Sequence, residues 1–312
     1  MSLNLKPTVK VHRTQVIGFT SYQFNVNLWK KIMKPIAHYT KFFTTIFTSI
    51  SLAFVLLGLS ACQQNDSNDQ NNPPEIPPQY SMSINSDFPQ NNTAQAAGTV
   101  TIQTTNNFTN AAANVLVGNA ILVGNLLIPV AAFLESFNHF PTLRSDNTWV
   151  WTYAVRFGGV FYTAELHAQV NGDEVDWNMY VTKPGEYLDF NWFSGVSARD
   201  GSMGTWTLRK DPTDSKDYLD IEWTYDKPSN TGTATYTNVL EGSTDKGSYI
   251  SYGTTTDLTY DAFYDIYSIS TDHFVQIEWN RTSHTGRINN PDFFQNPDWH
   301  YWDENLQDIA AP

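Results

Sequence analysis

The second half of the chain alternates apolar and polar residues with a period of two. After Thr148 this pattern is clearest in three stretches, YLDFNW (187–192), YLDIEW (218–223) and FVQIEW (274–279). One side of these stretches collects the apolar residues Leu188, Phe190, Trp192, Leu219, Ile221, Trp223, Val275, Ile277 and Trp279. Such alternation predicts half-buried antiparallel strands with their apolar side chains on one face of a sheet.

Turn signals separate the predicted strands, among them Asn171-Gly172, Pro184-Gly185 and Asp200-Gly201. Tight turns between long strands predict a mainly β fold, an antiparallel meander. A wide open sheet would leave unpaired edges and an uncovered apolar face. We therefore expect the meander to form a barrel or a strongly curved half-barrel, with one apolar N-terminal helical segment packed on it.

That apolar segment lies before the strands, at about residues 110–137. Its length and its alanine content favour a helix over a strand, and Gly118, Gly124 and Pro129 indicate a closely packed or broken one. Three interpretations remain open. The segment is a core helix lying on the sheet, an apolar surface for a ligand or partner, or a membrane-inserted helix.

The first 62 residues differ in charge from the rest of the chain. They contain seven Lys and Arg residues and no Asp or Glu, and an uncharged apolar run extends from Ile46 to Gly58. This run is short for a transmembrane helix, which needs about 20 apolar residues. A basic stretch, an apolar run and small residues, in that order, are typical of a signal peptide.

The segment Leu59-Ser60-Ala61-Cys62 ends this leader at the only cysteine of the chain. It resembles the lipobox of bacterial lipoproteins, in which an aliphatic residue and two small residues precede the cysteine. The resemblance implies cleavage before Cys62 and acylation of Cys62 by fatty acids such as palmitate, which anchor the protein in a membrane. It also implies sorting to the outer membrane, since Gln63 rather than an aspartate follows the cysteine.

These features predict the organisation of the chain. Residues 1–61 are expected to be the signal peptide, whose true start is expected at Met33 because the leader is otherwise unusually long. Residues 62–79 are expected to be the lipidated cysteine and a disordered tether rich in Asn, Asp and Pro. Residues 80–312 are expected to form a single β-rich domain.

Charge excludes one class of partner. All 31 acidic residues follow Cys62, together with 11 of the 18 lysines and arginines, so the chain beyond the leader has a formal charge of −20. Such a domain repels the phosphate backbone, and nucleic acid is not an expected partner.

Few residues indicate chemistry. The chain has no phosphate-binding loop and no nucleophile motif, and we expect no catalytic residue, no cofactor and no metal. Asp257, Asp261 and Asp265 fall on one side of a predicted strand, where successive carboxylates are too far apart to share one ion. They are expected to form a solvated face.

The tryptophans suggest mostly a core. Trp192, Trp206, Trp223 and Trp279 share the apolar sides of their predicted strands. Three aromatic residues stand instead in the polar tail NPDWHYWDEN, namely Trp299, Tyr301 and Trp302. They either close one end of the sheet or line a ligand-binding site.

Two classes of function remain open. The first is a non-catalytic cell-envelope lipoprotein, anchored to the membrane through Cys62, whose β domain binds a hydrophobic ligand or an envelope protein. The alternative is a surface-exposed glycan-binding module or glycan-processing enzyme. A concave apolar face favours the first, and a cleft with carboxylates beside an exposed tryptophan favours the second.

Overall fold

The computed structural model describes residues 72–83, 88–89 and 106–312. The predicted signal peptide, its start at Met33, the lipid attachment site Cys62 and the tether as far as residue 71 all lie outside the described residues. They therefore stay predictions.

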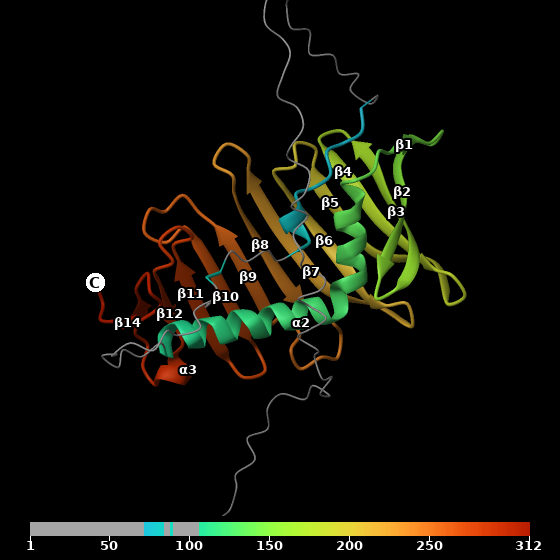
Figure 1. The fold of residues 1–312 in the computed structure, drawn as a ribbon. Coiled ribbons are helices and arrows are strands. Elements are labelled where there is room, and N and C mark those ends of the chain that lie inside the picture. The colour runs from blue at the N-terminus through green and yellow to red at the C-terminus, as the bar shows by residue number, and fades with distance from the viewer. Residues whose placement is uncertain (1–71, 84–87, 90–105) are drawn as a thin grey trace, which may run out of the picture. The chain divides into compact units, whose positions relative to one another are not determined.

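Within the described residues, fourteen strands form one antiparallel sheet, in which each strand pairs with its neighbour in the sequence (Figure 1). The predicted antiparallel meander is confirmed. The strands are β1 (Thr142–Leu143), β2 (Thr148–Phe157), β3 (Val160–Asn171), β4 (Glu174–Lys183), β5 (Tyr187–Ala198), β6 (Met203–Asp211), β7 (Asp214–Asp226), β8 (Thr231–Asn238), β9 (Tyr249–Thr254), β10 (Ala262–Ser268), β11 (His273–Trp279), β12 (Gly286–Asn289), β13 (His300–Trp302) and β14 (Asp308–Ile309).

The sheet is open, so the barrel alternative is wrong. Its two end strands, β1 and β14, do not pair with each other. Each is only two residues long, and a short edge strand offers little backbone for unwanted pairing. Closure is not needed to bury the apolar face because a helix covers it.

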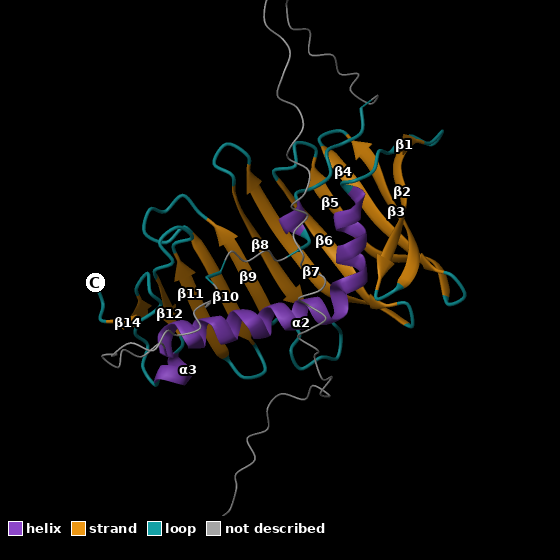
Figure 2. Cartoon of the chain, in the orientation of Figure 1, coloured by secondary structure: helices purple, strands orange, loops and turns teal. Residues whose placement is uncertain are grey.

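That helix, α2 (Asn106–Ser136), lies across one face of the sheet (Figure 2). Two shorter helices, η2 (Gln79–Ser81) and α3 (Pro291–Phe294), complete the helical elements of the described residues. α2 is bent (Figure 1) and contains Pro129, which has no backbone N–H to donate within the helix. Among the described residues, no helix is long and apolar enough to cross a membrane.

The first arm of α2 lies against the C-terminal strands. The carboxylate of Asp308 on β14 accepts hydrogen bonds from the backbone N–H groups of Asn106 and Asn107, at 3.1 and 3.0 Å. A carboxylate there satisfies helix N–H groups that have no intrahelical partner and suits the positive end of the helix dipole. Further along, Gly118 allows close approach, since a Cβ there would lie 2.6 Å from the hydroxyl oxygen of Tyr264.

The second arm of α2 lies against the N-terminal strands. Phe133 is fully buried and packs edge-on against Phe193 and Trp206. The hydroxyl of Tyr153 on β2 donates to the carbonyl oxygen of Ala132 at 2.7 Å. α2 thus connects the two ends of the sheet across its apolar face.

The period-two prediction fails locally in β5. Phe190 and Trp192 face the core side as expected, but Leu188 is 77 % exposed. Register shifts between β4 and β5, at Met179/Tyr180 and Val181/Lys183, are the reason. Each added residue at a bulge changes which side chains face inward.

Several tryptophan side chains pack on the inner face of the sheet, and three of them lie over a glycine of the neighbouring strand. The predicted core positions of Trp192, Trp206, Trp223 and Trp279 are confirmed, with at most 4 % of each side chain exposed. Among the cross-strand tryptophan–glycine partners, Trp206 lies over Gly195, Trp223 over Gly204 and Trp302 over Gly286. Any side chain at these glycines would occupy the space of the indole ring.

We expect Gly204→Val to destabilise the fold by about 1–3 kcal/mol, because overpacking a filled core forces side chains and backbone to shift. A Cβ at Gly204 would lie 2.6 Å from Cζ2 of Trp223 and 2.7 Å from the carbonyl oxygen of Val196. Urea denaturation measures the free energy of unfolding. The neighbouring, exposed Thr205 provides a control, since Thr205→Val should change it by less than about 0.5 kcal/mol. Equal stability of Gly204→Val and the unmodified protein would contradict the packing described here.

Candidate functional site

The structure separates the three aromatic residues of the polar tail. Trp302 is 1 % exposed and belongs to the core, where it packs against Phe88 and Phe108. Its indole N–H donates to the carbonyl oxygen of His284 at 2.8 Å. Trp299 and Tyr301 are half-buried and lie away from that core.

Trp299 and Tyr301 instead meet at Arg287, on the face of the sheet opposite to α2. The guanidinium carbon of Arg287 lies 4.2 Å from the ring centroid of Trp299 and 4.8 Å from that of Tyr260. Tyr301 is the cross-strand partner of Arg287 on β13. Aromatic faces at these distances attract a cation through their quadrupole.

Arg287 is also paired with a carboxylate. Its partner on β11 is Glu278, whose Oε2 lies 2.8 Å from Nε and 2.6 Å from Nη2 of Arg287. A two-pronged contact of this kind holds both side chains in a defined geometry. Sequence reasoning missed Arg287 and Glu278, because their partners come from separate strands and a loop.

Tyr260, Glu278 and Arg287 line a hollow of about 420 Å³, which we call the outer cleft. It lies between the loop from Thr255 to Asp261 and the outward side chains of β10 to β12. Its lining includes Thr255, Asp257, Tyr260, Phe263, Glu278 and Arg287. The volume falls in the range of small-molecule sites, about 300–1,000 Å³.

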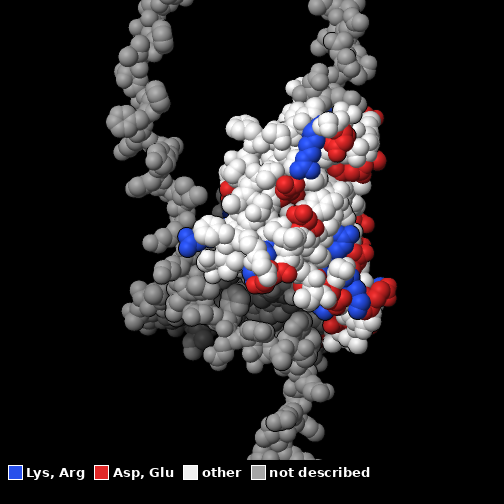
Figure 3. Space-filling model, turned by 90° about the vertical axis from the view of Figure 1, so that its right-hand side faces the viewer, with Lys and Arg blue, Asp and Glu red and all other residues white. Residues whose placement is uncertain are grey.

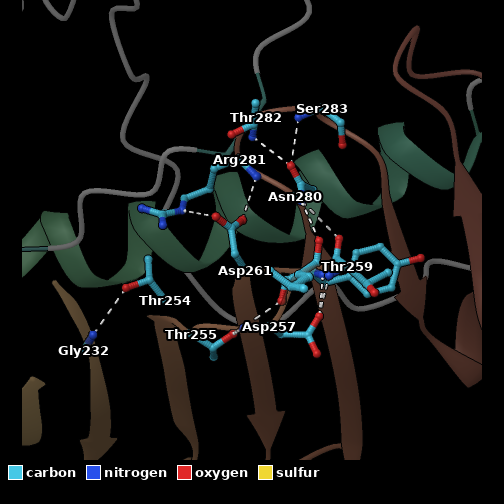
Figure 4. Close-up of polar contacts among 12 residues, drawn as sticks. Gly232, Thr254, Thr255, Asp257, Thr259, Asp261, Asn280, Arg281, Thr282 and Ser283 are labelled. Atoms are coloured by element: carbon cyan, nitrogen blue, oxygen red, sulfur yellow. Dashed lines mark hydrogen bonds and ion pairs between the residues drawn. The ribbon is translucent and has the colours of Figure 1, made fainter. Parts of the chain in front are cut away.

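The loop that carries Tyr260 is tied down by its own polar groups (Figure 4). The carboxylate of Asp257 accepts from the backbone N–H groups of Thr259 and Tyr260 at 2.7 and 2.9 Å. These bonds hold the pKa of Asp257 below its usual value. Asn280 donates through its side-chain amide to the carbonyl oxygens of Leu258 and Thr259.

The single strand predicted to hold three aspartates is therefore wrong. Asp257 and Asp261 stand in the loop, and only Asp265 lies on β10. Asp261 instead binds Arg281, accepting from its backbone N–H at 2.8 Å and from its Nε at 3.0 Å (Figure 4). Residues 257–266 alternate as a strand would, but Asp257 holds a turn, and β10 begins only at Ala262.

Asp265 has an unusual environment on the outer face. Its cross-strand partner on β11 is Gln276, which places Glu278 at the diagonal position of the same face. Burial, and then the negative charge of Glu278, raise the pKa of Asp265 to about 6. On the outer face, the carboxyl group of Asp265 therefore resists ionisation, whereas the neighbouring carboxylate of Glu278 is paired with Arg287.

No group of three or more His, Cys, Asp or Glu side chains among the described residues is placed to hold a metal ion. His300 stacks on Phe294 and contacts the side-chain oxygen of Asn296 at 3.1 Å. Glu165 lies 2.9 Å from both Arg144 and His167. His300, Glu165 and His167 thus contact other side chains of the protein.

Surface charge on the face shown in Figure 3 is mixed. Acidic and basic side chains of the described residues are interspersed there and form no extended area of one sign. Among the described residues, oppositely charged neighbours include Lys210 and Asp214, 3.0 Å apart.

Comparison with known proteins finds nothing similar to this chain: no protein-family model, no curated protein and no solved structure matches it.

We expect the carboxyl group of Asp265 to titrate near pH 6 in the folded protein. Glu278→Gln should lower this midpoint but leave it above the ordinary value of 3.8, since burial is the larger cause. Carbon-13 NMR of the side-chain carboxyl measures it. A midpoint below 4 in the unmodified protein would contradict the described environment.

The raised pKa also sets the sign of a stability effect. The folded state keeps the Asp265 proton while the unfolded chain loses it, so the free energy of unfolding falls as pH rises from about 4 to about 6. Above pH 6 this contribution is constant. Asp265→Asn should remove this part of the pH dependence in urea denaturation.

Proposed function

We propose that the protein is a non-catalytic lipoprotein of the cell envelope, anchored in the outer membrane through Cys62, whose β domain binds a glycan at the outer cleft. The observation that carries this proposal is the arrangement of Arg287 against the rings of Trp299 and Tyr260 beside Glu278.

This arrangement has the chemistry of a sugar site. Aromatic rings offer flat apolar surfaces for the C–H faces of a sugar, and an arginine–carboxylate pair offers fixed donors and acceptors for its hydroxyl groups. The cleft of about 420 Å³ has room for one or two sugar rings. The loop bonds of Asp257 keep Tyr260 in position before a ligand arrives.

A hydrophobic ligand, the first expectation from the sequence, fits this geometry less well. The apolar face of the sheet packs against α2, with Phe133, Trp206 and Leu208 fully or almost fully buried. The outer cleft instead has charged and hydroxyl groups in its lining. The glycan alternative is therefore the better match.

Binding without catalysis is favoured by the state of the carboxylates. Glu278 is held by Arg287 through two short contacts, whereas a nucleophile or general base must be free to meet its substrate. Asp265 lies under neighbouring side chains and does not belong to the lining of the outer cleft.

The glycan site is tested by Trp299→Ala. Loss of the ring removes one of the two rings that position Arg287, which lines the cleft, so binding on a glycan array should weaken by about tenfold or more. The matched control is Phe161→Ala, which removes an exposed aromatic ring that contacts Arg156 outside the cleft. Equal binding by both variants and the unmodified protein would rule out the outer cleft.

The anchor is tested by Cys62→Ala in the producing bacterium. The unmodified protein should partition into the detergent phase and carry the mass of acyl chains, whereas the variant should lack both. Ser60→Ala, which keeps a small residue beside the cleavage site, serves as the control. An unacylated Cys62 in the mature unmodified protein would overturn the anchor.

A further inference from the structure

A second hollow lies at the same end of the strands but on the helix-facing side of the sheet. This inner rim pocket has a volume of about 290 Å³. Aromatic side chains from η2, β7, β9 and β11 form much of its wall, namely Tyr80, Tyr225, Tyr252 and Trp279. Its volume is at the lower end for small-molecule sites and suits a single sugar residue.

The three tyrosine hydroxyls already donate to protein acceptors. Tyr80 donates to the carbonyl oxygen of Thr224 at 2.6 Å, and Tyr252 donates to the carbonyl oxygen of Tyr80 at 2.6 Å. Tyr225 donates to the side-chain oxygen of Asn230 at 3.0 Å. Burial raises the pKa of Tyr80 and of Tyr252 above its usual value, so these hydroxyls stay neutral. The tyrosines therefore present ring surface and no negative charge.

Arg281 and Trp279 contribute N–H donors to the wall of the inner rim pocket. Arg281 uses its backbone N–H and its Nε on Asp261, and the outer end of its guanidinium points away from that carboxylate (Figure 4). Trp279, buried to 2 % exposure, has an indole N–H with no hydrogen-bond partner among the described residues.

The guanidinium of Arg281 and the indole N–H of Trp279 are hydrogen-bond donors, which favours a ligand that is anionic and rich in acceptors. A carboxylate presents two oxygens at the spacing of two guanidinium nitrogens, which makes arginine its preferred partner. The aromatic wall favours a ring-shaped body attached to that carboxylate. A uronic acid, which is a sugar ring with a carboxylate, combines both features.

We propose that the inner rim pocket binds a carboxylated sugar residue, with the terminal nitrogens of Arg281 on the carboxylate and the tyrosine rings against the sugar. This inference rests on the proposed glycan-binding function and names an acidic sugar as the class recognised at a second subsite. Arg281 and the loop from Thr255 to Asp261 connect the two sites, because Asp261 ends that loop and holds Arg281.

The test uses the full-length lipoprotein in detergent micelles, with glucuronic acid and galacturonic acid as probes and glucose and galactose as neutral controls. Ligand-observed NMR measures the dissociation constants. We expect the unmodified protein to bind the uronic acids at least about tenfold more tightly than the neutral sugars, as expected for a hydrogen bond to a charged group.

Arg281→Gln should remove this preference. The double variant Asp261→Asn/Arg281→Gln avoids leaving Asp261 without a partner and should show the same loss, with thermal unfolding as the check on folding. Arg156→Gln, at an exposed arginine on β2, makes the same change in net charge outside the pocket and should keep the preference.

The outcomes separate the two proposals. Uronic acid binding that survives in both Arg281 variants, or equal affinity for acidic and neutral sugars, overturns the inner rim pocket as a carboxylate site. If Trp299→Ala then still abolishes glycan binding, the proposed function stands without it. If the unmodified protein binds neither these sugars nor any glycan on the array, both proposals fail.

Discussion

The fold depends on covering one apolar face of a sheet that does not close. Fourteen antiparallel strands place their inward tryptophans and aliphatic residues on a single side, which needs a partner layer to exclude water. α2 supplies much of that layer. It is fastened near one end of the sheet by Asp308, through the N–H groups of its first turn, and near the other by Tyr153 and Phe133.

The same requirement explains the glycines within the strands. A bent helix and a twisted sheet must pack closely while the sheet carries large indole rings, and at three positions a glycine makes room for a ring on the adjacent strand. The pairing of Trp206 with Gly195 and of Trp223 with Gly204 repeats on successive strands. Shape complementarity between neighbours, rather than hydrophobicity alone, thus specifies the register of the central strands.

The two hollows lie outside the contact between α2 and the sheet, since neither is lined by a residue of α2. Loops and strand ends there bring polar groups and aromatic residues together on both sides of the sheet, and the inner rim pocket also reaches the core residues Tyr252 and Trp279. Asp261 and Arg281 stand between the hollows, with the outer cleft on one side and the inner rim pocket on the other. A ligand long enough to pass over the end of the strands would meet both, which suits a chain-like molecule better than a compact one.

The sequence by itself determined the antiparallel meander and the core side of its tryptophans, because alternation along a strand is a local property that burial enforces. It also marked Trp299 and Tyr301 as candidates. It did not determine that the sheet stays open, since closure depends on what covers the apolar face. It also misplaced Leu188, whose side depends on bulges between strands. Only the tertiary structure brought Arg287, Tyr260 and Trp299 together, because a strand, a loop and the polar tail meet there through pairing that no local pattern encodes.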